Sequence, residues 1–90
     1  MFNVLEELFN LVRARKKNPI EDSYTNKLLK DKNLSKEKVL EEIKELIEAV
    51  ETNNNKIHEA ADVFYHLIIY LEVNNIKIED VMTELRNRKK

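Results

Sequence analysis

The sequence predicts an all-α protein, built as a bundle of four or five helices. Its 90 residues include no glycine and one proline, whereas strands and tight turns normally need glycine. Hydrophobic residues make up 42% of the chain and charged residues 37%, and the hydrophobic ones recur at helical spacing. A chain of this length suits one domain, so residues 1–90 are expected to form a single unit.

The first part of the chain predicts one long helix and one short one. The long helix covers about Val4–Lys17 and ends in basic residues, which suit the negative end of a helix dipole. Asn18-Pro19 ends it, because a residue before proline disfavours the helical conformation. After the connector, a short helix is expected through Lys30, with Asp22 or Ser23 as its N-cap.

The rest of the chain predicts three further helices. The first spans about Ser35–Glu51 with Ser35 as N-cap, and asparagines in the turn Thr52–Asn55 tolerate left-handed backbone angles. The central helix spans about Lys56–Val73, and the last covers Ile78 to about Arg88. The helix before the turn carries an apolar stripe formed by Val39, Leu40, Ile43, Leu46, Ile47 and Val50. The last helix is expected to direct three apolar side chains inward, Val81, Met82 and Leu85.

Charge and composition exclude several classes of protein. The net charge of -1 gives no electrostatic basis for binding nucleic acid. The chain has no cysteine, which excludes disulfides and thiolate metal sites. The longest near-apolar run, Val63–Leu71, is too short to span a bilayer, and the N-terminal residues carry acids where a signal peptide carries bases. We therefore expect a cytoplasmic protein with neither nucleic-acid nor membrane partners.

The central helix combines an apolar surface with three ionisable side chains on one stripe. At about 100° per residue, Glu59, Asp62 and His66 lie within roughly 60° of one another. Acids on so apolar a helix are costly unless a cation, a proton or hydrogen-bond donors compensate them. The stripe therefore predicts a metal or substrate site.

The same helix has more apolar surface than its short neighbours within the chain can cover. A second subunit is the simplest cover, so we expect the bundle to be completed by dimerisation, as a homodimer or a higher homo-oligomer. The side chains expected against another subunit are Phe64, Ile68 and Leu71.

Two pairs of acids at a spacing of three residues define the predicted metal site. Glu42 and Glu45 form one pair, and Glu59 and Asp62 form the other. Residues three apart share one side of a helix, and a short turn makes the two helices antiparallel neighbours. Four carboxylates then face one groove, where they would repel one another without a cation. Oxygen ligands of this kind predict Mg²⁺, with Mn²⁺ as the alternative.

Hydroxyl and cationic side chains elsewhere could hold the phosphates of a nucleotide substrate. The candidates for substrate binding are the hydroxyls of Ser23, Tyr24 and Thr25, the lysines Lys27, Lys30 and Lys38, and His66, one turn after Asp62. For most of them an ordinary surface role is the competing interpretation.

These residues resemble the phosphoribosyl-ATP pyrophosphatase family, within the wider all-α MazG-type nucleotide pyrophosphohydrolases. The resemblance covers nearly the whole chain and rests on the order of several motifs. They are Arg13-x-Arg15-Lys16-x-Asn18-Pro19, Ser23-Tyr24-Thr25-x-Lys27-Leu28-Leu29, Lys38-Val39-x-Glu41-Glu42-x-x-Glu45, Glu59-Ala60-Ala61-Asp62-x-x-Tyr65-His66-Leu67 and Ile78-x-Asp80-Val81-x-x-Glu84-Leu85.

The resemblance implies Mg²⁺-dependent hydrolysis of 1-(5-phosphoribosyl)-ATP to 1-(5-phosphoribosyl)-AMP and pyrophosphate, the second step of histidine biosynthesis. By motif, the four paired acids match metal ligands and Glu41 matches an additional acid. Glu41 or Glu45 would orient or deprotonate the attacking water. The chain departs from the family pattern at Leu40, in place of glycine, and within Asp31–Glu37, which is shorter. Both departures flank the segment expected to contact the substrate.

Two other functions remain open from the sequence. A related pyrophosphohydrolase that removes non-canonical or surplus nucleoside triphosphates would share the acids and the bundle. A helical interaction module without enzymatic activity would use the acids only for structure, and it would show no stabilisation by Mg²⁺ or Mn²⁺.

Overall fold

The computed structural model describes residues 1–89, so the last residue of the expected 1–90 domain lies outside the described part. Within residues 1–89 the chain is helical and has no strand, which confirms the all-α prediction. The helices are α1 (Asn3–Lys17), α2 (Tyr24–Leu29), α3 (Lys32–Thr52), α4 (Lys56–Val73) and α5 (Ile78–Asn87). None of the helices within these residues is long and apolar enough to cross a membrane.

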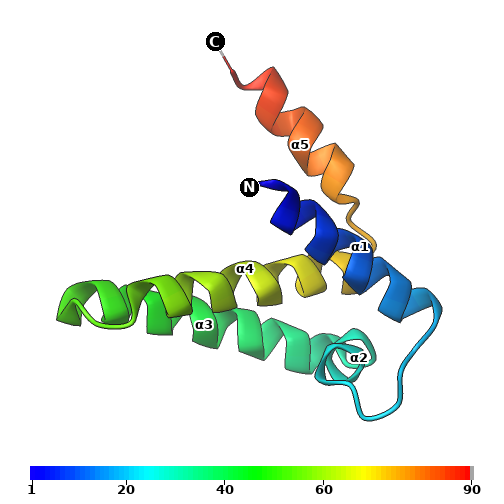
Figure 1. Cartoon of the computed structure of the whole chain (residues 1–90), viewed down its shortest axis with the longest axis horizontal. Helices are drawn as coiled ribbons and strands as arrows, with labels where there is room; N and C mark the ends of the chain where they lie inside the picture. Colours follow the sequence, from blue (N-terminus) through cyan, green and yellow to red (C-terminus); the bar gives the residue numbers. More distant parts are fainter. Residues whose placement is uncertain (90) are drawn as a thin grey trace.

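The two longest helices, α3 and α4, form an antiparallel pair along their whole length (Figure 1). The turn between them uses asparagine in the left-handed region, with φ of 54° at Asn53 and 57° at Asn55. This confirms the prediction that asparagine supplies these turn angles in a chain without glycine. The turn sets the register that brings the two acid pairs to one groove.

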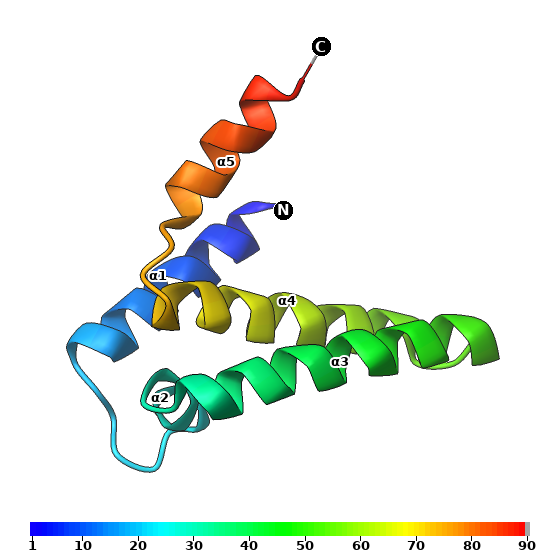
Figure 2. The same ribbon diagram turned by 180° about the vertical axis from the view of Figure 1, so that it is seen from behind.

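The hydrophobic core lies where α1 and α2 pack against the C-terminal half of α4. Its buried side chains are Val12, Leu28, Ile68, Ile69 and Val73. Ile68 is only 9% exposed, so the expectation that it faces another subunit is wrong: it packs against α1 and α2 within its own chain. Figure 2 shows the same arrangement from behind, with α2 beneath one end of the α3–α4 pair.

Hydrogen bonds fix α2 to the end of α1. The Ser23 hydroxyl accepts a bond from the backbone N–H of Asn26, which confirms Ser23 as the N-cap of α2. The same hydroxyl accepts a bond from Arg15, while the Asn26 amide donates to the backbone carbonyl of Arg15. A short helix that would be unstable alone is therefore held by polar bonds as well as by the core.

The start of α3 differs from the prediction. The helix begins at Lys32, and the Asp31 carboxylate accepts from the backbone N–H of Leu34, so Asp31 is the N-cap. Ser35, predicted as the cap, lies inside the helix and is 1% exposed. Aspartate and serine are about equally good N-caps, so residue type alone does not decide between two nearby candidates.

The last helix, α5, projects away from the α3–α4 pair (Figure 1). Arg13 of α1 donates two hydrogen bonds to the Glu79 carboxylate, and Lys16 donates to the backbone carbonyl of Glu72 and to the Asn75 side chain. No residue of α5 is buried. The expectation that its apolar side chains point into the bundle is therefore wrong for Met82 and Leu85, which are exposed because α5 does not pack along the other helices.

Candidate active site

The predicted acids gather on the facing sides of α3 and α4. Carboxylate oxygens of Glu41, Glu42 and Glu45 lie within 4.8 Å of one another. Across the groove, an oxygen of Glu59, an oxygen of Asp62 and a ring nitrogen of His58 also lie within 4.8 Å of one another. The charges of Glu45, Asp62 and Glu59 all act on Glu42, so the two acid pairs form one electrostatic cluster.

Two carboxylate oxygens at the centre of this cluster are buried and have no hydrogen-bond partner among the described residues. They are Oε2 of Glu42 and Oε2 of Glu59. Glu42 is 9% exposed, and burial together with the neighbouring carboxylate of Glu45 raises its pKa to about 7. Burial also raises the pKa of Glu59, and the charges of Glu45 and Asp62 act in the same direction. Buried, unpaired carboxylate oxygens are the donor set of a hard divalent cation.

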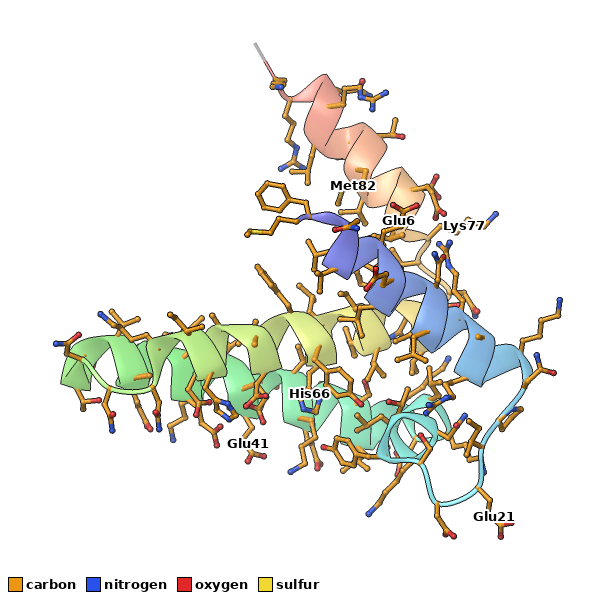
Figure 3. The ribbon with its side chains drawn as sticks, viewed as in Figure 1. Glu6, Glu21, Glu41, His66, Lys77 and Met82 are labelled. Atoms are coloured by element: carbon orange, nitrogen blue, oxygen red, sulfur yellow. The ribbon has the colours of Figure 1, made fainter. Side chains whose placement is uncertain are left out.

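His66 lies beside this cluster in the interior. Figure 3 shows it extending from α4 toward α3, whereas Glu41 points outward from α3. His66 is 6% exposed, its Nε2 lies 3.9 Å from Oε1 of Glu42, and its Nδ1 has no partner within the described chain. Burial lowers the pKa of His66, so the ring is neutral at neutral pH and the nitrogen facing Glu42 carries no fixed positive charge.

Two residues that the sequence analysis did not select also belong to this region. His58 places its Nε2 3.3 Å from Oδ2 of Asp62, one helical turn away. The spacing of four residues within α4 would have revealed this pair. Tyr65 packs edge-on against His66, with ring centroids 5.1 Å apart. The resemblance pointed to Tyr65 only as part of a motif.

The predicted substrate residues divide into two groups. Tyr24 and Lys38 lie near the acids: the Tyr24 ring is 5.9 Å from that of His66, and Nζ of Lys38 is 3.4 Å from Oε2 of Glu41. Tyr24 is 46% exposed. Its pKa is raised chiefly by partial burial, with the charges of Lys38, Glu42 and Glu41 also acting on it.

Ser23 is the N-cap of α2, and Thr25 and Lys27 lie within that helix. The Ser23 hydroxyl is already hydrogen-bonded to Arg15 and to Asn26, and the Thr25 hydroxyl is hydrogen-bonded to Tyr65. Lys27 and Lys30 line a surface groove of about 670 Å³ that reaches Tyr24 and includes none of the paired acids. The structure thus joins Tyr24, Lys38 and His66 to the acids, and does not join Ser23, Thr25 or Lys27.

Comparison with known proteins agrees with this geometry. The sequence model of the phosphoribosyl-ATP pyrophosphohydrolase family matches residues 5–89, a span that contains all five helices except the first two residues of α1. The chain belongs to this family. The matched span includes both acid pairs, His66 and the whole of α2.

Curated relatives of this pyrophosphohydrolase family come from bacteria and archaea. A phosphoribosyl-ATP pyrophosphatase of Clostridium acetobutylicum is 44% identical over 89 residues, which cover 94% of this chain and 80% of that protein. One from Bacillus mycoides is 41% identical, covering 98% of this chain and 85% of that protein. The histidine biosynthesis bifunctional protein HisIE of Pyrococcus furiosus is 40% identical, covering 98% of this chain and 42% of that protein. No solved structure gives a significant match.

Proposed function

We propose that this chain hydrolyses 1-(5-phosphoribosyl)-ATP to 1-(5-phosphoribosyl)-AMP and pyrophosphate, a step of histidine biosynthesis. Its place in the phosphoribosyl-ATP pyrophosphohydrolase family supports this function over the MazG-like triphosphatase and the interaction module. The structural observation that carries the proposal is the pair of buried carboxylate oxygens, on Glu42 and Glu59, that have no partner among the described residues. A purely structural module has no reason to bear the cost of burying them.

Glu42, Glu45, Glu59 and Asp62 are the proposed ligands of Mg²⁺, for which Mn²⁺ could substitute. When bound, the cation would supply positive charge against the triphosphate and the leaving pyrophosphate. Burial matters to this role, because Glu42 and Glu59 hold their ionised form at a cost that a bound cation offsets. His58 and His66 border two of these acids, with Nε2 3.3 Å from Oδ2 of Asp62 and 3.9 Å from Oε1 of Glu42.

Glu41 and Glu45 are the candidates for orienting the attacking water or taking its proton. Exposure supports Glu41 for this role, because its side chain is half exposed and points outward from α3, whereas Glu45 is partly buried and acts on both Glu42 and Glu59. Lys38, whose Nζ lies 3.4 Å from Oε2 of Glu41, offers a cation to a phosphate oxygen beside this carboxylate.

A panel of triphosphates tests the proposed substrate. Purified protein with Mg²⁺ is assayed with phosphoribosyl-ATP, ATP, dUTP and dCTP, and kcat/KM is measured for each. We expect phosphoribosyl-ATP to exceed the other three by at least about tenfold, a difference of about 1.4 kcal/mol in transition-state binding. A preference for dUTP or dCTP would instead assign the chain to the triphosphate-removing enzymes, and no turnover of any substrate would favour the interaction module.

The assembly is also part of this proposal. Apolar side chains of α3 and α4 that the chain itself does not cover are Leu40, Ile43, Ile47 and Val50 on α3 and Ile57, Phe64 and Leu67 on α4. Those on α3 follow a seven-residue repeat, the spacing by which helices pack side by side over several turns. A second copy of the α3–α4 pair is their proposed cover, which would give four packed helices.

Replacing Ile47 or Phe64 with lysine should therefore dissociate the protein. Ile47 is 53% exposed and Phe64 56% exposed in the single chain, so neither substitution should disturb the core. Light scattering at micromolar concentration should give at least twice the 10.7 kDa chain mass for the wild type and the chain mass for either variant. Ile20→Lys is the matched control, because Ile20 is 51% exposed in the connector, and it should leave the assembly intact. A monomeric wild type would refute the assembly.

A further inference from the structure

A hydrogen bond between α2 and α4 connects Thr25 with Tyr65, a partly buried side chain that packs against the core. The Thr25 hydroxyl and the Tyr65 hydroxyl are 2.5 Å apart, and Thr25 is 7% exposed. The residues are 40 positions apart in the sequence, so this bond ties the short helix α2 to the helix that carries Glu59 and Asp62. It is a polar contact that orients α2 relative to α4, in addition to the bonds that join Ser23 and Asn26 to Arg15.

Tyr65 also belongs to a cluster of three rings, in which the His66 ring lies nearest to both tyrosines, with centroids 5.1 Å from Tyr65 and 5.9 Å from Tyr24. Its ring lies nearly parallel to that of Tyr24, with centroids 6.4 Å apart and planes 14° apart. His66 meets both tyrosines edge-on, at 84° to each. Such stacked and edge-to-face contacts have defined geometry, so fixing the Tyr65 ring restricts the direction of Tyr24 both directly and through His66, which contacts both rings.

Tyr24 is the member of the cluster that remains available to a ligand. It is 46% exposed at the start of α2, whereas His66 is 6% exposed and Tyr65 is partly buried. An exposed aromatic ring beside a cluster of acids and Lys38 can stack against a nucleobase, because every base presents a π-face to such a ring. The affinity gained from such stacking is greater when the Tyr24 ring is held in one orientation before the ligand arrives.

We infer that Tyr65 is a positioning residue, whose hydroxyl bond to Thr25 fixes the Tyr24 ring as a stacking surface for the base of the nucleotide. This inference rests on the proposed function for the identity of the nucleotide. It assigns the Thr25 hydroxyl to Tyr65 and not to a phosphate. Tyr65 acts through Tyr24 and has no direct contact with the reacting phosphorus.

Removing the bond from either side should have the same effect. Tyr65→Phe and Thr25→Val each remove one hydroxyl, and a hydrogen bond worth about 1 kcal/mol corresponds to about a fivefold rise in KM, with kcat changed less. The double variant should be no worse than either single variant, because both delete the same bond. Thr25→Ser restores a hydroxyl and should restore KM. Tyr70→Phe, the same change elsewhere on α4, is the matched control.

A second measurement does not depend on turnover. In the wild type, nuclear Overhauser effects should connect the ring protons of Tyr24 with those of Tyr65 and His66, and Thr25→Val should weaken them while leaving the core signals of Ile69 unchanged. An unaltered KM in Tyr65→Phe, additive effects in the double variant, or unchanged ring contacts would each overturn the inference. A wild type without activity on phosphoribosyl-ATP would instead defeat the proposed function, and the ring contacts would still test the role of Tyr65.

Discussion

Replacing Asp62 with asparagine or Glu45 with glutamine should lower kcat/KM for phosphoribosyl-ATP by at least about 100-fold, since each change removes a proposed metal ligand. The fold should survive, because both side chains are only partly buried and belong to a group of like charges. Neutralising one carboxylate relieves repulsion on Glu42, so the melting temperature without metal should be unchanged or higher. Circular dichroism melting and steady-state kinetics at limiting Mg²⁺ measure both effects.

Glu37→Gln is the matched control for these variants. It makes the same chemical change on α3, at an exposed position outside the acid cluster, and should keep wild-type kinetics. Wild-type turnover in Asp62→Asn or Glu45→Gln at limiting Mg²⁺ would refute the metal assignment, whatever the substrate.

Stability without metal should fall as the pH rises from about 5 to about 8. Glu42 has its pKa raised to about 7 in the folded protein from 4.5, so between these values the folded state binds more protons than the unfolded state. The loss of stability begins as the pH rises above the pKa of Glu42 in the unfolded chain, and it is complete once the pH exceeds the pKa of Glu42 in the folded protein. From a shift of this size we expect a loss on the order of 2 kcal/mol over this range, or several degrees in melting temperature.

Saturating Mg²⁺ should remove most of this pH dependence, because a cation at the cluster stabilises the ionised carboxylates. Without metal, Glu42→Gln should make this pH dependence smaller, and the raised pKa of Glu59 should account for part of what remains. Burial lowers the pKa of His66, so below its ordinary pKa this residue makes stability rise with pH, opposite to the effect of Glu42. Because His66 is present in both the wild type and Glu42→Gln, its contribution is common to the two proteins. Equal pH dependence in the wild type and Glu42→Gln would contradict the account of the buried carboxylate.

The sequence predicted those parts of the fold that depend on local patterns alone. The bounds of α4 and the asparagine turn before it follow from helical periodicity and from the left-handed tolerance of asparagine. The interior or exterior position of a residue was harder to predict. Ile68 and Leu85 are both apolar residues on amphipathic helices, yet Ile68 is buried and Leu85 is 54% exposed, because only the tertiary arrangement determines which helix packs on which.

In the candidate site too, features that depend on local spacing were predictable, and features that depend on tertiary packing were not. The spacing within each acid pair and the short turn between α3 and α4 were enough to predict that the two pairs lie close together, and the charges of Glu45, Glu59 and Asp62 all act on Glu42. The pairing of His58 with Asp62 is also local and could have been found from its four-residue spacing. The bond from Thr25 to Tyr65 spans 40 residues and depends on how α2 packs, so no pattern within one helix reveals it.

Hydrolysis of phosphoribosyl-ATP in ¹⁸O-labelled water tests the central claim most directly, because it reports both the substrate and the bond that breaks. If water attacks the α-phosphorus, pyrophosphate leaves as one unit and its formation equals that of phosphoribosyl-AMP. Mass spectrometry should then find the label in phosphoribosyl-AMP and none in pyrophosphate, with no orthophosphate released. Label in the pyrophosphate would mean attack at the β-phosphorus, and release of orthophosphate would mean attack at the γ-phosphorus. Either result would contradict a pyrophosphohydrolase acting at the α-phosphorus.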